Sequence, residues 1–186
     1  MLKRRIIPKL QLSLRSSFRG PQPVLVVTSQ FDRRRAIGDP VSQAKIYEAQ
    51  LVDELLLVDL ERTEESWSVL LTTLETMADA LATPLAVGGG LHGFEQVQEL
   101  LDRGADKVVL NSAALESPQL VDQVAGAYGA QCVVLSLDTR PNPQGGWRVW
   151  GACGIEDSGR DALQWALEAV DRGAGEVLAT AIDKDG

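Results

Sequence analysis

The sequence predicts an α/β fold with a parallel sheet, and three observations lead to this prediction. Short apolar segments alternate along the 186 residues with longer segments whose apolar residues recur at helical spacing. Residues 55–58 are apolar without interruption, which is typical of a strand buried on both faces. The third observation is an internal repeat, because residues 52–59, 104–111 and 173–180 each place a charged residue before an apolar strand. Repeated units of this length predict a (β/α)8 TIM-type barrel, of which about strands 1–6 are present.

Composition and charge exclude several classes of protein. Hydrophobic residues make up 45% and charged residues 24% of the chain, and no apolar run is long enough to cross a membrane. The net charge of −8 argues against nucleic acid as the main partner. Cys132 and Cys153 are far apart, and the sequence shows neither a metal-binding cluster nor a secretory signal. We therefore expect one domain over residues 1–186, in the cytoplasm, without a metal, a cofactor or a membrane partner.

The first half of the chain supplies three strands and three helices. Residues 5–10 are expected to form the first strand, and residues 12–38 a functional loop with a candidate hairpin arm at 24–27. Asp39 and Pro40 match the N-cap and first position of a helix that runs to about residue 50. Strands at 54–59 and 85–87 flank a helix whose core-facing stripe extends from Trp67 to Leu81. The third helix begins near Phe94 and is ended by Gly104.

The second half continues the same alternation. Strands are expected at residues 107–110, 132–137 and 176–181, and Cys132 is expected to be a buried thiol. Ser117 and Pro118 cap a helix that runs to Tyr128, and residues 141–146 match the tip of a hairpin that returns through 147–150. The helix at 161–172 is expected to turn four apolar residues inward: Leu163, Ala166, Leu167 and Val170.

The segment Leu85–His92 carries the strongest local signal for chemistry. Its glycines follow an apolar strand and precede a helix, so the backbone can approach an anion while amide N–H groups point at it. A tight strand-to-helix turn explains the same glycines without a ligand. In a barrel, chemistry gathers at the carboxyl ends of the strands, which are expected here at Gln11, Asp59, Gly88–Gly90, Asn111, Ser112, Asp138, Asp183 and Asp185.

Seven motifs occur in an order and spacing that make chance agreement improbable. They are Arg5–Pro8, Gly38–Pro40, Asp53–Leu55, Val87–His92, Gly104–Val108, Asn111–Ala113 and Ile182–Gly186. Together they resemble the cyclase subunit of imidazole glycerol phosphate synthase, a (β/α)8 barrel of histidine biosynthesis. The resemblance extends over the whole sequence.

The resemblance implies an activity, a partner and a set of site residues. In that family a glutaminase subunit docks at the amino-terminal barrel face and releases ammonia, which crosses the barrel to a phosphorylated ribulosyl substrate. Cyclisation and cleavage give imidazole glycerol phosphate and an aminoimidazole carboxamide ribotide. The positions that match phosphate or substrate contacts are Gly89, Gly90, Asn111, Ser112, Asp59, Asp183, Asp185 and Gly186. The positions that match the ammonia gate are Arg5, Glu54, Lys107 and Glu176, for which ion pairs that merely stabilise the barrel are the alternative.

The sequence departs from the family in two places. The family's catalytic pair is one aspartate ending strand 1 and another ending strand 5; Asp138 matches the second, whereas Gln11 occupies the position of the first. A glutamine amide cannot transfer a proton near neutral pH, and a positioned acid or base contributes roughly 10²–10⁴-fold to the rate. The sequence also stops after strand 6, so we expect a fragment truncated relative to the family rather than a barrel completed by another chain.

Two functions from different classes follow from these residues. The first is a lyase of the cyclase type, in which Asp138 performs acid–base work. The second is a catalytically altered paralogue that conducts ammonia and supports an amidotransferase in surface-sugar (lipopolysaccharide) modification, a role that Gln11 would permit. Arg33–Arg35 is then either a docking surface or an exposed loop. His92 follows the glycine turn and is expected to be a helix-entry residue.

Overall fold

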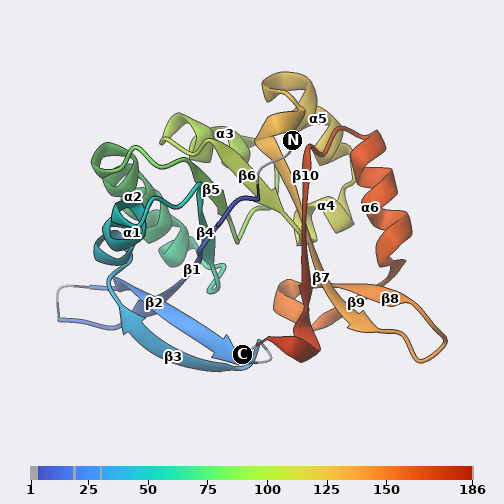
Figure 1. The fold of residues 1–186 in the computed structure, drawn as a ribbon, viewed down its shortest axis with the longest axis horizontal. Helices are drawn as coiled ribbons and strands as arrows, with labels where there is room; N and C mark the ends of the chain where they lie inside the picture. The colour runs from blue at the N-terminus through green and yellow to red at the C-terminus, as the bar shows by residue number, and fades with distance from the viewer. Residues whose placement is uncertain (1–3, 19, 30, 186) are drawn as a thin grey trace. The chain divides into compact units, whose positions relative to one another are not determined.

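The computed structural model describes residues 4–18, 20–29 and 31–185 (Figure 1). Parallel strands alternate with helices, which confirms the predicted α/β class. The chain groups into two compact units, the first comprising residues up to 27, 35–90 and 98–106, and the second comprising the remainder. Within the described ranges, no helix combines the length and the apolar character that a membrane crossing requires.

The first unit is built on the parallel strands β1 (Lys9–Arg15), β4 (Leu55–Asp59) and β5 (Leu85–Gly88), with β4 in the middle. Strand β2 (Gln22–Ser29) folds back antiparallel along β1, and β3 (Arg33–Gly38) lies next to β2. Residues 28–29 and 33–34 of these two strands group with the second unit. The helices of this part of the chain are α1 (Pro40–Ala49), α2 (Glu64–Ala80) and α3 (Phe94–Asp102).

Strand β1 begins and ends later than the sequence predicted. Residues 5–8 precede it, because Pro8 has no N–H to contribute to a strand ladder. The strand then continues to Arg15, because β2 supplies an antiparallel partner beyond the parallel pairing with β4. Gln11 therefore lies inside β1, opposite Val58 on one side and Val26 on the other. The prediction that Gln11 ends its strand is wrong.

Local sequence signals set the boundaries of the first two helices. The Asp39 carboxylate accepts a hydrogen bond from the Ser42 N–H at 2.8 Å, and Pro40 follows it, which confirms the predicted start of α1. Thr63 and Ser66 form a reciprocal capping box at the start of α2. The expected stripe of α2 is in the core, where Leu70, Leu74 and Met77 are fully buried.

The second unit is built on the parallel strands β6 (Lys107–Leu110), β7 (Val133–Pro141) and β10 (Glu176–Ala181), with β7 in the middle. Strand β8 (Trp147–Gly151) returns antiparallel along β7, and β9 (Glu156–Asp161) pairs with β8. The helices are α4 (Ser112–Glu116), α5 (Gln119–Tyr128) and α6 (Ala162–Asp171), with the short 3-10 turns η1 (Ala130–Cys132), η2 (Ala152–Gly154) and η3 (Ile182–Lys184).

Strand β7 also extends beyond its predicted end at residue 137. Residues Asp138–Pro141 pair with Trp147–Trp150 of β8, so Asp138 lies inside the strand and not at its end. The sequence did not predict α4 or β9, both of which are short and have weak periodicity. Cys132 precedes β7 in η1 and is buried, as predicted.

The buried face of α6 differs from the expected one. Leu163, Leu167 and Val170 are 65%, 53% and 50% exposed, whereas Trp165 and Ala169 are buried. The spacing correctly identified an apolar stripe, but it could not identify which side of the helix packs against the strands. The prediction of an inward face made of Leu163, Leu167 and Val170 is therefore wrong.

Candidate functional site

In the second unit, a hydrogen-bond network forms around the carboxylate of Asp138. Asp138 is 8% exposed, and its neighbours across the sheet are Trp150 of β8 and Thr180 of β10. The Asn111 amide nitrogen Nδ2 donates to Asp138 Oδ2 at 3.1 Å and to the Ser136 carbonyl at 3.2 Å. Because Asn111 directly follows β6, two neighbouring strands hold this carboxylate in one orientation.

Ser112 extends the network to the turn that follows β8. Its Oγ donates to Asn111 Oδ1 at 3.2 Å and accepts from the Ala152 N–H at 2.9 Å. Ala152 and Cys153 adopt φ values of 51° and 58°, which are uncommon for residues with a Cβ. The Ser112 hydroxyl thus stabilises a left-handed turn in the same network as Asp138.

The structure therefore brings together one predicted acid–base residue and two predicted phosphate-binding residues, namely Asp138, Asn111 and Ser112. A buried carboxylate that is oriented by an amide donor is suited to accept or return a proton. Ala152, whose N–H completes the network, was not predicted from the sequence, where the only signal for a turn at this position is the pair of nearby glycines, Gly151 and Gly154.

In the first unit, Asp59 closes the turn that leads into α2. It is 1% exposed and accepts hydrogen bonds from the Glu61 N–H at 3.0 Å, the Arg62 N–H at 3.1 Å and the Ser66 hydroxyl at 2.6 Å. These contacts engage both carboxylate oxygens and favour a structural role. A substrate contact by Asp59 stays a prediction.

Gly89 and Gly90 adopt φ values of 94° and 69° in the turn that follows β5. A Cβ at Gly89 would lie 2.2 Å from the Asp59 carbonyl oxygen, and one at Gly90 would lie 3.4 Å from Arg62 Cα. Close packing on the Asp59 turn thus explains both glycines, and phosphate binding by them stays a prediction. Beyond this turn, the His92 N–H donates to Gln96 Oε1 at 2.6 Å, which agrees with a helix-entry role for His92.

Gln11 is half-buried on β1, next to the fully buried Leu12. Its backbone lies between β2 and β4, so the sheet fixes its position on both sides. A glutamine here offers hydrogen bonds but no titratable proton.

The predicted gate residues form one ion pair within each unit. Arg5 Nη1 lies 2.9 Å from Glu54 Oε2 in the first unit, where the Glu54 side chain is 5% exposed and that of Arg5 is 41% exposed. Lys107 Nζ lies 2.8 Å from Glu176 Oε1 in the second unit. Lys107 is the first residue of β6, Glu176 is the first residue of β10, and Glu54 directly precedes β4. Arg5 lies four residues before β1. The charges thus pair as the sequence suggested, and ammonia gating stays a prediction.

The predicted carboxylates near the end of the sequence have different contacts. Asp183 Oδ2 lies 3.5 Å from Lys184 Nζ. Asp185 Oδ2 accepts hydrogen bonds from the Thr28 hydroxyl and from the Phe31 N–H. Gly186, the last of the predicted contacts, lies outside the described residues.

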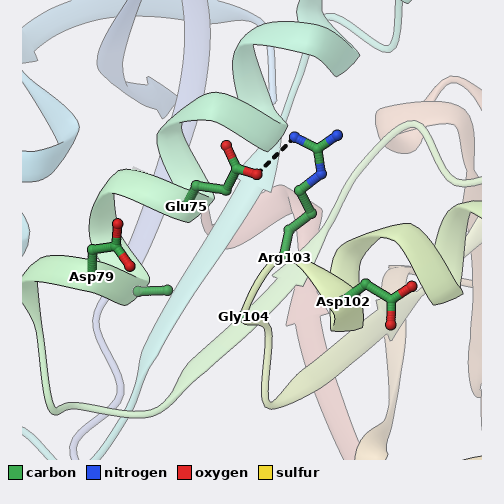
Figure 2. A pocket seen from close by; sticks show the side chains of 6 residues that line it. Glu75, Asp79, Asp102, Arg103 and Gly104 are labelled. Atoms are coloured by element: carbon green, nitrogen blue, oxygen red, sulfur yellow. Dashed lines mark hydrogen bonds and ion pairs between the residues drawn. The ribbon is translucent and has the colours of Figure 1, made fainter.

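A surface pocket of about 400 Å³ in the first unit contains none of the predicted site residues (Figure 2). It lies at the carboxyl-terminal ends of α2 and α3 and is lined by Glu75, Ala78, Asp79, Asp102, Arg103 and Gly104. Arg103 Nη1 pairs with Glu75 Oε1 at 2.8 Å across it. Among the described residues, no group of histidine, cysteine and acidic side chains is arranged to hold a metal ion.

Shifted pKa values occur at surface ion pairs and caps. The backbone N–H of Ala82 lowers the pKa of Glu48, assisted by the Thr83 N–H and hydroxyl. The Gly159 N–H, together with Arg148, lowers the pKa of Asp157. Hydrogen bonds to Glu168 and then Asp122 raise the pKa of Arg172. Each cause is an ion pair or a backbone hydrogen bond of a side chain at the surface, and none of these groups is a predicted site residue, so these shifts indicate surface structure and not a catalytic site.

Comparison with known proteins agrees with the resemblance. The profile of a family described as "Histidine biosynthesis protein" matches residues 5–186. A Prochlorococcus marinus (strain MIT 9313) protein, provisionally named imidazole glycerol phosphate synthase subunit hisF2, is 61% identical over 186 residues, which are the whole chain and 71% of that protein. Proteins named imidazole glycerol phosphate synthase subunit HisF, from Streptococcus sanguinis (strain SK36) and Caulobacter vibrioides (strain NA1000 / CB15N), are 41% and 40% identical. The whole chain aligns with 71% and 69% of their lengths.

Proposed function

Because the chain belongs to the histidine biosynthesis protein family, and within it to the HisF subunits of imidazole glycerol phosphate synthase, we propose that it is a subunit of that synthase acting on a phosphorylated ribulosyl ribonucleotide. The reaction is the ammonia-dependent cyclisation and cleavage that forms imidazole glycerol phosphate. Family membership also implies the (β/α)8 barrel, to which the parallel strands and intervening helices of both units correspond.

The observation that supports this proposal most directly is the network of Asp138, Asn111 and Ser112. Asp138 is the candidate acid–base group, because the Asn111 amide orients its carboxylate in a buried position. Ser112 and Asn111 are candidates for holding a phosphate, since both lie at the carboxyl end of β6. A substrate whose phosphate binds at Asn111 and Ser112 would lie beside the Asp138 carboxylate, which would transfer protons to and from the substrate.

Gln11 limits this chemistry to one of the two expected carboxylates. An active protein would then rely on Asp138 for proton transfer, with the Gln11 amide restricted to hydrogen bonding. The conduit-and-scaffold hypothesis gains no support over the cyclase, because the relatives compared above are all named as synthase subunits.

The test measures formation of imidazole glycerol phosphate from the ribulosyl substrate with added ammonium. Asp138→Asn should lower the rate roughly 10²–10⁴-fold, because the amide is nearly isosteric and cannot transfer the proton. Gln11→Asp should raise the rate well above that of the unaltered protein. Equal rates for the unaltered protein and Asp138→Asn would refute the assignment of Asp138, and no gain from Gln11→Asp would show that Gln11 is not what limits activity.

We further propose a glutaminase subunit as partner, docked at the amino-terminal ends of the parallel strands, where the two ion pairs lie. Lys107→Met should change glutamine-driven turnover while ammonium-driven turnover stays the same, because added ammonium need not pass the gate. Lys45→Met on α1 is a matched control, since Lys45 is exposed and lies outside the proposed gate. Equal effects of Lys107→Met on both turnovers would refute the gate.

A further inference from the structure

The carboxylate of Asp185 connects two segments that are far apart in the sequence. Its Oδ2 accepts from the Thr28 hydroxyl at 2.7 Å and from the Phe31 N–H at 3.0 Å. Thr28 is the second-to-last residue of β2, which forms a hairpin with β3, and Asp185 follows β10 and the turn η3 (Figure 1). All three residues belong to the second unit. Hydrogen bonds to a charged acceptor are stronger than those between neutral groups.

The conformation of Phe31 shows why this contact matters locally. Phe31 has a φ of 62°, an uncommon value for an aromatic residue, and its N–H is the group that donates to Asp185. A Cβ added at Gly154 would lie 3.1 Å from Phe31 Cδ2 and 3.0 Å from Ile182 Cδ1. The Phe31 ring and the buried Ile182 therefore both pack against the backbone of Gly154. Packing and hydrogen bonding fix the same segment.

We propose that Asp185 is a positioning residue that tethers the adjoining ends of β2 and β3, which belong to the second unit, to the segment that follows β10. The tethered residues are Thr28, Ser29 and Phe31–Arg34, and the tether determines where the basic start of β3 lies. This role goes beyond the proposed cyclase function and does not depend on it. It also differs from the substrate contact that the resemblance implies for Asp185, because the tether uses Asp185 Oδ2 to bind Thr28 and Phe31 of the same chain.

Hydrogen–deuterium exchange of the 186-residue chain, followed by mass spectrometry, tests the tether. Asp185→Ala should accelerate exchange in the peptide that contains Phe31 by about tenfold or more, because its N–H loses a charged acceptor. Thr28→Val, which removes one of the two hydrogen bonds, should give a smaller acceleration. Asp185→Asn should retain most of the protection, because its amide oxygen can still accept from both donors. Asp183→Ala is the matched control and should leave this peptide unchanged.

The outcomes separate a tether from a general loss of structure. Faster exchange confined to the hairpin, with unchanged β6 and β7 peptides and recovery in Asp185→Asn, supports the proposal. The proposal is overturned if the hairpin peptide of a folded Asp185→Ala protein exchanges at the same rate as in the unaltered chain. It is also overturned if Asp183→Ala accelerates exchange of this peptide as much as Asp185→Ala does. Where circular dichroism shows that Asp185→Ala unfolds, Thr28→Val decides: faster hairpin exchange supports the tether and unchanged exchange overturns it. None of these readouts requires cyclase activity, so a failed tether and a failed cyclase assignment are distinguishable.

Discussion

Replacement of Asp59 by asparagine tests whether this carboxylate is structural. In the native turn, Oδ1 accepts from the Glu61 N–H, and Oδ2 accepts from the Arg62 N–H and the Ser66 hydroxyl. Asparagine presents one oxygen and one NH2 group, so its best orientation keeps the oxygen where two donors converge. The NH2 group then faces the Glu61 N–H, which is left without an acceptor in a buried turn.

The expected cost follows from that single unpaired donor. A buried donor that loses its acceptor destabilises the folded state by about 1–3 kcal/mol. In a protein of this size each 1 kcal/mol corresponds to a decrease in melting temperature of roughly 2–4 °C. Asp59→Ala, which removes the acceptor for all three donors, should cost more than Asp59→Asn.

Thermal and urea unfolding followed by circular dichroism provide the measurement. Asp79→Asn on α2 is the matched control, because Asp79 is exposed, and its effect should stay within about 0.5 kcal/mol. An Asp59→Asn protein as stable as this control would refute the structural role and would leave the carboxylate available for substrate.

Three further predictions concern the packing of a glycine, the exposed face of α6 and the pH dependence of stability. Gly89→Ala should destabilise the protein by about 3 kcal/mol or more in urea unfolding, because the new Cβ would collide with the Asp59 carbonyl and the residue has a positive φ. Gly93→Ala is the control and should have little effect, because there is open space where its Cβ would lie. Leu163→Lys combined with Leu167→Lys should leave the melting temperature in thermal unfolding nearly unchanged, because both side chains are exposed. A large decrease in the melting temperature would contradict the observed exposure of these two leucines. Because its folded-state pKa is lowered, Glu48 contributes stability that is present above its ordinary pKa of 4.5 and is lost as the pH falls through the lower folded-state value. The free energy of unfolding should therefore fall less steeply with decreasing pH in Glu48→Gln than in the unaltered protein. Identical profiles of unfolding free energy against pH in the two proteins would contradict this prediction.

The hydrogen-bonded role of Asp59 illustrates what the sequence could not reveal. A carboxylate after a buried strand is equally compatible with substrate binding and with closing a turn, because both use the same oxygens. A partial signal was present, since Thr63 and Ser66 at the start of α2 form a capping box, and Ser66 also donates to Asp59. That second contact depends on the path of the turn and could not be inferred from spacing alone.

The network around Asp138 was partly predictable. The positions of Asn111, Ser112 and Asp138 after apolar strands predicted that they would gather at one edge of the sheet, and the structure places them in one hydrogen-bond network. The hairpin with its tip at residues 141–146 and its return through 147–150 was predicted and is confirmed, but the preceding strand was predicted to end at residue 137, before Asp138. The β8 residues that pair with residues 138–141 lie six to twelve positions further along the chain, so the apolar pattern of residues 132–137 alone did not show that the strand continues.

The sequence by itself determined the α/β class, the approximate order of strands and helices, and the caps of α1, because these depend on local spacing and on side chains that bond to their own backbone. Tertiary structure decided which apolar stripe of α6 is buried, which carboxylates are engaged by buried donors, and how far β1 and β7 extend. These properties arise from contacts between segments far apart in the chain. The free energy of such a contact depends on the partner that the fold supplies, and this partner cannot be identified from the residue's immediate neighbours in the sequence.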